Sequence, residues 1–514
     1  MKKTNMFICL ILAALLILPS CSASMSPSNR YEEGENDRNG YSYTVPPEQG
    51  YNYDPQAVQI KENEFIKTAE NAVSTFSADV DTASYTYLRR RLNNTDKLSG
   101  IMDHSGNIRT EELINYFKYD YKEPVNGDLF GVSAKLVDCP WNDESSLLIL
   151  GLQTEKAKVK TDNNLVFLID VSGSMYGEDK LPLLQKTFSY LLSALDENDT
   201  VSIVTYSAGE KVVLEGCAGN ETETIQSAID SLEARGSTNG EAGMKTAYQI
   251  AEKYYKPNGN NRIIMASDGD LNVGISSVDG IKKFVSDKRG EGVYLSVLGF
   301  GYGNYRDSIM EAIADCGNGV YYYIDGAAEA EKIFCDDLLS TLYTVAEDVK
   351  LQITFQPDNV AEYRLIGYEN RIMKAEDFKN DKKDAGELGA GHRVTVCYEL
   401  KLSVGRVNTE KLFDFAVRYK KPGADASIQN DYEMLYSEIK TEHDRDTNFI
   451  AALCELTMLL HKSKYGENVT LASVRGLLSR YDYKDDTYKY QLITLLYRLK
   501  DDVTNTADNV RDPR

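Results

Sequence analysis

The fold is decided by Leu165-Val166-Phe167-Leu168-Ile169 and the loop that follows it directly, Asp170-Val171-Ser172-Gly173-Ser174. The five apolar residues form a continuous run without alternation, which is typical of a strand buried on both faces of a parallel sheet. An acid and two hydroxyls then occupy every second position of the loop. Because such sheets bind ligands at the carboxyl ends of their strands, we expect Asp170, Ser172 and Ser174 to form part of a binding site.

Short apolar runs alternate with amphipathic segments from here to about residue 346. The expected strands are residues 165–169, 201–206, 262–266, 293–298 and 320–324, and the expected helices are residues 180–195, 222–232, 241–254, 278–287 and 307–314. Strands that alternate with helices of this length predict a doubly wound α/β domain with a parallel sheet, which we place at residues 161–346.

Strand-like segments flank this domain on both sides. Residues 131–160 precede it and residues 347–440 follow it, so we expect them to join as one β-sandwich into which the α/β domain is inserted. Residues 65–130 carry helical patterns and form an N-terminal region in this interpretation. Residues 441–502 predict a small C-terminal helical module, and residues 503–514 a polar tail.

Two further loops place oxygen atoms at strand ends or helix starts. Thr238 lies just before the expected helix at residue 241, and Asp268 directly follows the expected strand 262–266. Carboxylate and hydroxyl oxygens suit hard cations such as Mg²⁺, Mn²⁺ or Ca²⁺. The sequence therefore predicts one divalent-cation site built from five residues: Asp170, Ser172, Ser174, Thr238 and Asp268. An alternative is that these polar residues only cap helices and shape turns.

The N-terminus reads as an export signal. Lys2 and Lys3 precede an apolar run over residues 6–18, which is too short to span a bilayer comfortably. The sequence Leu18-Pro19-Ser20-Cys21 resembles the bacterial lipobox, which implies that residues 1–20 are removed and that Cys21 carries lipid. Ordinary cleavage nearby is the alternative. Residues 21–64 are polar with few aliphatic side chains and predict a flexible tether.

Composition excludes some classes of partner. The chain of 514 residues has a net charge of −22, and a nucleic-acid binder needs a basic surface. Six cysteines outside the N-terminal segment show no Cys-x-x-Cys spacing and predict mostly buried thiols, with at most one bonded pair. These are Cys139, Cys217, Cys316, Cys335, Cys397 and Cys454.

No enzymatic motif accompanies the predicted metal site. The four histidines lie far apart without the paired spacing of a zinc hydrolase, and there is no Gly-x-Ser-x-Gly elbow. The glycines of residues 299–303 lack the Lys-Ser/Thr of a phosphate loop. We therefore expect a binding protein rather than an enzyme. Asp270 and Asn272 either support the metal or shape the turn after Asp268.

The combination of Asp-x-Ser-x-Ser, a distant Thr and a later Asp-Gly resembles the metal-ion-dependent adhesion site (MIDAS) of von Willebrand factor type A (VWA) domains. Further segments resemble one bacterial branch, the YfbK-like VWA lipoproteins: residues 74–85, 111–117, 267–274, 365–371 and 384–392. The resemblance implies a Rossmann-like VWA fold and a divalent cation, usually Mg²⁺. It also implies a partner protein whose acidic side chain completes the metal site.

We therefore expect a lipid-anchored cell-envelope protein that binds a protein partner through its metal. Ser22 after Cys21 is not acidic, which favours the outer membrane of a Gram-negative source, with the body facing the periplasm or the surface. A structural scaffold whose metal only stabilises the fold is the main alternative. A metal-assisted hydrolase is a remote one.

Overall fold

The computed structural model describes residues 60–156, 162–238, 240–269, 278–301, 307–337, 343–383, 385–405 and 410–503. The predicted signal, the predicted lipidation site Cys21 and most of the predicted tether lie outside the described residues, as do Asp270 and Asn272. None of the helices in the described ranges is both long and apolar enough to cross a membrane.

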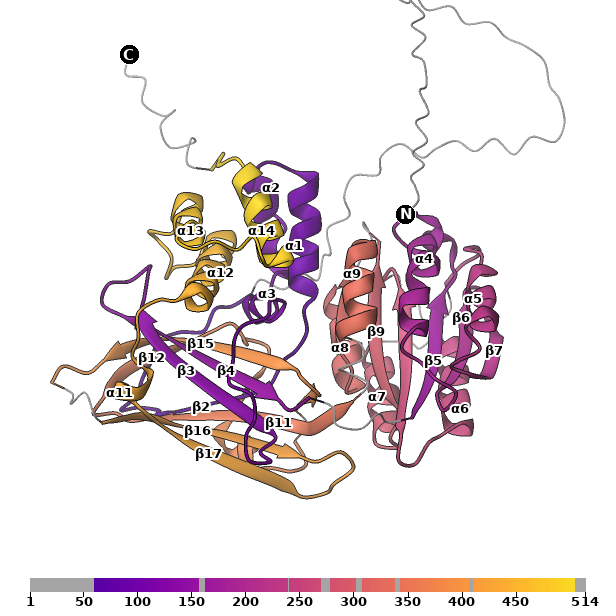
Figure 1. The fold of residues 1–514 in the computed structure, drawn as a ribbon, viewed down its shortest axis with the longest axis horizontal. Coiled ribbons are helices and arrows are strands. Elements are labelled where there is room, and N and C mark those ends of the chain that lie inside the picture. Colours follow the sequence, from indigo (N-terminus) through magenta and orange to yellow (C-terminus); the bar gives the residue numbers. More distant parts are fainter. Residues whose placement is uncertain are drawn as a thin grey trace, which may run out of the picture. The chain divides into compact units, whose positions relative to one another are not determined.

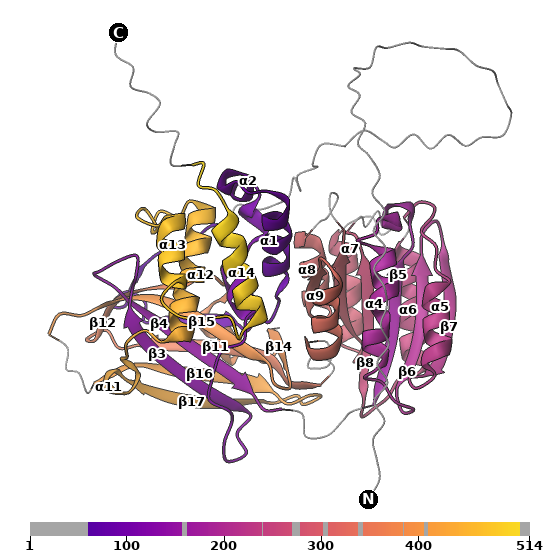
Figure 2. The same cartoon turned by 45° about the horizontal axis from the view of Figure 1, so that its top comes forward.

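A mostly parallel six-stranded sheet forms the centre of the α/β domain (Figures 1 and 2). Its spatial order is β10-β9-β8-β5-β6-β7. The strands are β5 (Asn163–Asp170), β6 (Thr200–Tyr206), β7 (Glu210–Ala218), β8 (Asn260–Ser267), β9 (Tyr294–Phe300) and β10 (Tyr321–Ile324). The five strands predicted from apolar runs are confirmed and pair in parallel.

Helices cover both faces of this sheet. Leu165, Phe167 and Ile169 of β5 pack into one hydrophobic core, whereas Val166 and Leu168 pack into the other. The first core is closed by α4 (Leu181–Leu192), α5 (Thr222–Asp230) and α9 (Ala327–Lys332), and the second by α6 (Gly240–Lys253), α7 (Val278–Arg289) and α8 (Asp307–Cys316). Burial on both faces explains why residues 165–169 of β5 are a continuous apolar run.

The expectation of a purely parallel sheet is wrong at one edge. Strand β7 pairs antiparallel with β6, and the sequence pattern did not predict it. Its residues are exposed or half-buried, because an edge strand has few neighbours to bury them. Glu210, Lys211 and Glu215 therefore interrupt the apolar signal by which a strand is recognised.

Two antiparallel sheets form the second part of the structure. One has the order β1-β12-β15-β4-β3 and the other β13-β2-β11-β16-β17, with β14 (Gly386–Gly389) paired to β11. Their facing sides share one hydrophobic core. The strands are β1 (Ile66–Lys67), β2 (Val73–Ser77), β3 (Phe130–Asp138), β4 (Ser146–Thr154), β11 (Thr344–Phe355), β12 (Val360–Ile366), β13 (Ile372–Met373), β15 (Arg393–Leu402), β16 (Lys411–Lys420) and β17 (Ser427–Leu435).

The helical reading of the N-terminal region is only partly correct. Strand β2 lies between β13 and β11 in the second sheet, where Phe76 pairs with Leu351 of β11, and β1 pairs with β12. Helices α1 (Ala83–Asn94), α2 (Leu98–Met102) and α3 (Thr110–Asn115) follow these strands. A five-residue strand such as β2 becomes recognisable only through the distant partner that completes its hydrogen bonds.

The N-terminal and C-terminal helices share a single hydrophobic core and lie side by side in Figure 1. The C-terminal helices are α12 (Arg445–His461), α13 (Leu471–Leu478) and α14 (Thr487–Arg498), preceded by the short α11 (Tyr436–Ile439). Helix α12 is buried along nearly its whole surface, so it needs neighbours on every side. The C-terminal helices therefore complete a layer with α1–α3 over the outer face of the first antiparallel sheet.

Three of the six cysteines among the described residues are buried: Cys139, Cys397 and Cys454. Cys217, Cys316 and Cys335 are only partly buried, so half of the predicted buried thiols are confirmed.

Candidate metal centre

The two predicted acidic ligands lie at the same edge of the parallel sheet. Asp170 is the last residue of β5, and Asp268 directly follows β8. The strands are parallel neighbours in which Ile169 pairs with Ala266, so both carboxylates leave the sheet at its carboxyl edge. Asp170 is fully buried and Asp268 is 2% exposed. Burying two carboxylates at one edge without a nearby positive charge is energetically costly, so this edge favours the binding of a cation.

The loop after β5 turns its hydroxyls towards each other. The backbone N–H of Ser172 donates to Asp170 Oδ1 at 2.8 Å, which fixes the start of the loop. The Oγ atoms of Ser172 and Ser174 are 3.0 Å apart. Ser174 lies in a short 3₁₀ turn, η2 (Gly173–Tyr176). Alternate positions of this loop thus bring two hydroxyls together beside the carboxylate.

The loop that carries Thr238 is fastened to the same place. Gly173 N donates to the carbonyl of Gly236 at 2.9 Å, and Arg235 N donates to the carbonyl of Val171 at 2.7 Å. Thr238 follows two residues after Gly236 and is half-buried. These backbone hydrogen bonds hold the segment before α6 against the loop of Ser172 and Ser174.

Two contributors were not identified from the sequence as parts of the site. Lys180 Nζ donates to Asp268 Oδ2 at 2.8 Å and to the carbonyl of Ser174 at 2.8 Å. Ser267 donates from Oγ to Asp170 Oδ2 at 3.2 Å. The only sequence signal for Lys180 is that a basic residue follows the Asp-x-Ser-x-Ser loop closely.

Burial governs the electrostatics of the site. It raises the pKa of Asp170 to about 6; the amide N–H of Ser172 opposes this, and the charge of Asp268 adds to it. Burial and the nearby Asp170 also raise the pKa of Tyr206. A cation bound here would offset the cost of keeping two buried carboxylates ionised.

The side chains present fit a divalent cation. Carboxylate and hydroxyl oxygens are the donors that Mg²⁺ prefers, and the ammonium of Lys180 shows that the surroundings of Asp268 accommodate positive charge. Asp170, Ser172, Ser174 and Asp268 are joined at the carboxyl edge by hydrogen bonds and strand pairing, with Thr238 on the adjoining loop.

A different acidic cluster carries no metal in our interpretation. Asp79, Asp81 and Glu112 are buried with carboxylate oxygens close together. Arg371 binds Asp79 at 3.1 Å and Asp81 at 3.0 Å, and Arg109 binds Glu112 at 2.8 Å. Arginines already supply the positive charge, so the cluster is an ion-pair network.

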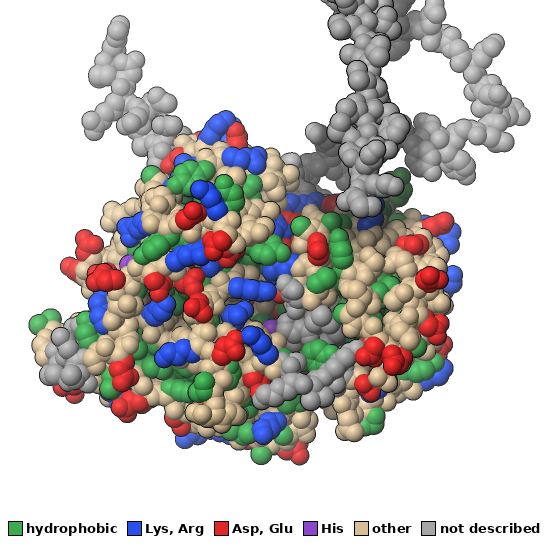
Figure 3. Space-filling model, viewed as in Figure 1, with side chains coloured by type: hydrophobic (Ala, Val, Ile, Leu, Met, Phe, Trp, Pro, Cys, Tyr) green, Lys and Arg blue, Asp and Glu red, His purple; other side chains and the backbone are tan. Residues whose placement is uncertain are grey.

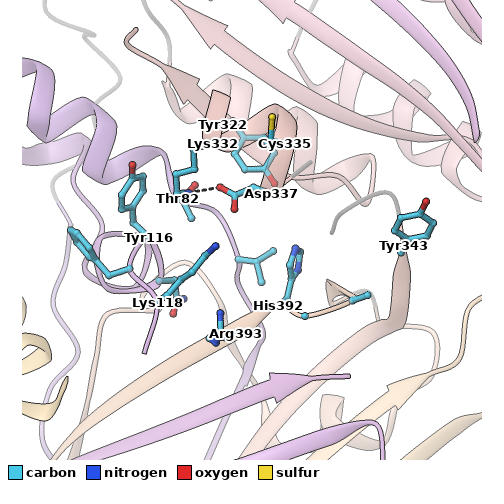
Figure 4. A pocket seen from close by; sticks show the side chains of 15 residues that line it. Thr82, Tyr116, Lys118, Tyr322, Lys332, Cys335, Asp337, Tyr343, His392 and Arg393 are labelled. Atoms are coloured by element: carbon cyan, nitrogen blue, oxygen red, sulfur yellow. Dashed lines mark hydrogen bonds and ion pairs between the residues drawn. The ribbon is translucent and has the colours of Figure 1, made fainter. Parts of the chain in front are cut away.

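A polar cavity of about 430 Å³ is lined by residues of the N-terminal region, the α/β domain and the antiparallel sheets. Figure 4 shows Lys118, Lys332 and Arg393 around it. Lys332 pairs with Asp337, and burial lowers the pKa of His392 to about 4, so this imidazole is neutral at pH 7. The cavity therefore makes a weaker case for a ligand site than the carboxyl edge of the sheet.

Family models match most of the chain. The model for the von Willebrand factor type A domain matches residues 164–335, a model described as von Willebrand factor matches residues 52–149, and one described as uncharacterized protein YfbK, C-terminal, matches residues 340–501. The fold and these matches define a VWA-domain protein.

Similarity to individual proteins identifies the family within the VWA-domain proteins. The chain is 36% identical over 479 residues to the uncharacterized protein YfbK of Escherichia coli strain K12, covering 87% of this chain and 81% of that protein. It is 25% identical over 364 residues to human inter-alpha-trypsin inhibitor heavy chain H3, covering 67% of this chain but 37% of that one. A solved von Willebrand factor type A structure from Catenulispora acidiphila covers 71% of this chain and 88% of its own, with a TM-score of 0.43 and 14% identity. The protein belongs to the YfbK family.

Proposed function

We propose that the protein binds a partner protein through a divalent cation held at the carboxyl edge of its VWA sheet. The observation that carries the proposal is the convergence of buried Asp170 and Asp268 with the hydroxyls of Ser172 and Ser174 at the end of two adjacent parallel strands. VWA domains commonly hold a divalent cation and generally mediate protein binding, which supports this use of the site.

The donor set explains how such a site would recognise its partner. Ser172, Ser174 and Thr238 would hold the cation with neutral oxygens, while Asp170 and Asp268 supply the negative charge. The bound cation would act as a Lewis acid with affinity for one more anionic oxygen. An acidic side chain of the partner protein would provide that oxygen. This proposal includes no catalytic step, because the five donors contain no nucleophile paired with a general base.

The sequence of the N-terminus also supports a proposal for the location of the protein in the cell. Lipid on Cys21 would anchor the chain in the cell envelope, and residues 21–64 would tether the folded part to the membrane surface. Ser22 after Cys21 favours the outer membrane, with the folded part of the chain in the periplasm or at the surface.

Affinity capture from solubilised cell envelope tests the function. The full chain is used in Mg²⁺ and in EDTA, beside Asp170→Asn and the matched control Asp143→Asn. Asp143 is exposed and lies between β3 and β4, outside the loops of the site. A protein enriched in Mg²⁺ by wild type and Asp143→Asn, and lost with EDTA or Asp170→Asn, would support metal-dependent binding. Equal capture under all conditions would favour a scaffold whose metal only stabilises the fold.

A further inference from the structure

Lys180 lies among the atoms that are proposed to hold the cation. It immediately precedes α4, and its Nζ donates to Asp268 Oδ2 and to the carbonyl oxygen of Ser174, each at 2.8 Å. The lysine side chain is 14% exposed and that of Asp268 is 1% exposed. The site therefore contains a cationic group of its own, attached to the chain.

Packing as well as charge directs this ammonium into the site. A Cβ added at Gly301 would lie 2.2 Å from Lys180 Cε, and a Cβ added at Gly177 would lie 3.6 Å from Lys180 Cδ. The methylene stem thus passes closely over the backbone of Gly301, at the end of β9. Gly301 also has a φ of 81°, a conformation that favours glycine. A stem held this way loses little further freedom when its ammonium binds Asp268.

The ammonium of Lys180 and a divalent cation would repel each other if both were bound to the carboxylate of Asp268. Asp170 accepts hydrogen bonds from the backbone N–H of Ser172 and from the hydroxyl of Ser267, both neutral groups. Lys180 supplies the positive charge that lies on Asp268. A second cation at Asp268 would stand a few ångströms from the ammonium in a largely buried site. Repulsion between like charges is strong at such a separation and low exposure.

We propose that Lys180 is a tethered counter-cation that occupies Asp268 in the metal-free protein and must leave it when a divalent cation binds. The inference rests on the proposed metal site. The buried carboxylate of Asp268 would then be paired with a cation in both forms of the protein, with the ammonium of Lys180 in the metal-free form and with the divalent cation in the metal-bound form. It also makes the affinity for the metal weaker than the oxygen donors alone would give, because the ammonium has to be displaced.

Calorimetric titration of the full chain with MgCl₂ and with MnCl₂ tests the competition. The variant is Lys180→Met, which keeps most of the stem and removes the charge. Lys186→Met is the matched control, since Lys186 lies on α4, the helix that begins directly after Lys180, but is 69% exposed and pairs with Glu178 at the surface. We expect Lys180→Met to bind the cation at least tenfold more tightly than wild type, and Lys186→Met to match wild type within twofold.

The melting temperature is a second measurement, and in the metal-free form we expect Lys180→Met to be less stable than wild type although it binds the metal more tightly. In EDTA, Lys180→Met should melt below wild type, because Asp268 is buried without the ammonium. Added Mg²⁺ should then raise the melting temperature of Lys180→Met more than that of wild type. A merely structural lysine would lower the melting temperature in both conditions and leave the metal affinity unchanged.

The outcomes separate this inference from the proposed function. If wild type binds Mg²⁺ in a manner abolished by Asp170→Asn, but Lys180→Met binds equally or more weakly, the metal site stands and the role of Lys180 is refuted. If neither wild type nor Lys180→Met binds Mg²⁺ or Mn²⁺, the proposed metal site is wrong and the inference is overturned with it.

Discussion

Arg371 joins three parts of the chain, and its replacement by methionine should lower the free energy of unfolding. Its guanidinium binds Asp79 at 3.1 Å, Asp81 at 3.0 Å and Asp315 of α8 at 2.9 Å. The two acids that follow β2 have side chains no more than 4% exposed, and the arginine side chain is 12% exposed. Removing it leaves at least two buried carboxylates without their cation.

Breaking a buried ion pair from one side costs about 3–5 kcal/mol, because the remaining charge stays buried without compensation. We expect Arg371→Met to lose that amount at pH 7. Burial and the neighbouring Asp79 and Asp315 already raise the pKa of Asp81, and losing Arg371 removes the group that opposes this rise. The loss should therefore shrink as the pH falls towards 4, where protons neutralise the acids.

Urea unfolding followed by circular dichroism measures the effect, with the slope of free energy against urea compared between variants. Lys283→Met is the control, since Lys283 forms an exposed ion pair with Asp287 on α7, a kind of pair that contributes at most about 1 kcal/mol. A loss for Arg371→Met no larger than that of Lys283→Met, or one that stays constant between pH 4 and pH 7, would refute the reasoning. The arginine would then be dispensable for holding the three parts together.

Two further predictions concern a buried acid and the sheet core. Burial, with Glu369 and Asp79 nearby, raises the pKa of Glu111 to about 8, so its contribution to stability is full below about pH 4.5 and is lost as the pH rises towards 8. Glu111→Gln should therefore stabilise the protein at pH 8.5 by about 3 kcal/mol more than at pH 5, as measured by urea unfolding; an equal effect at both pH values would contradict this. Phe167 is 2% exposed and meets the Phe188 ring edge-on at 4.8 Å, so Phe167→Ala should cost about 3–5 kcal/mol in the same assay, whereas Val125→Ala, at a side chain 63% exposed, should cost less than about 0.5 kcal/mol.

Local pattern was sufficient for the five parallel strands of the α/β domain. Residues 165–169 of β5 are each buried on one face of the sheet or the other, so this run is apolar and could be recognised without knowing its neighbours. The same logic placed Asp170 and Asp268 at one edge, because parallel strands end together. The cation itself stays a prediction for binding measurements to test.

Local sequence pattern did not predict strands whose partner strand is distant in the sequence or whose side chains are largely exposed. Strand β2 is short, and its place in the sheet depends on β11, which lies more than 250 residues further along the chain. Edge strand β7 is exposed and carries charged side chains, so its periodicity is weak. In both elements the strand conformation is stabilised by hydrogen bonds to a partner that local composition does not reveal.

The buried parallel strands and the helices between them could be predicted from the sequence, because they follow from the solvent exposure of consecutive residues. The oxygen donors at the strand ends could be predicted because they directly follow those strands. The tertiary structure was needed to show that helices α1–α3 and α12–α14 close one core, and that the stem of Lys180 crosses Gly301 to bring an ammonium to Asp268. Those arrangements depend on contacts between residues far apart in the chain, and periodicity carries no information about which distant groups meet.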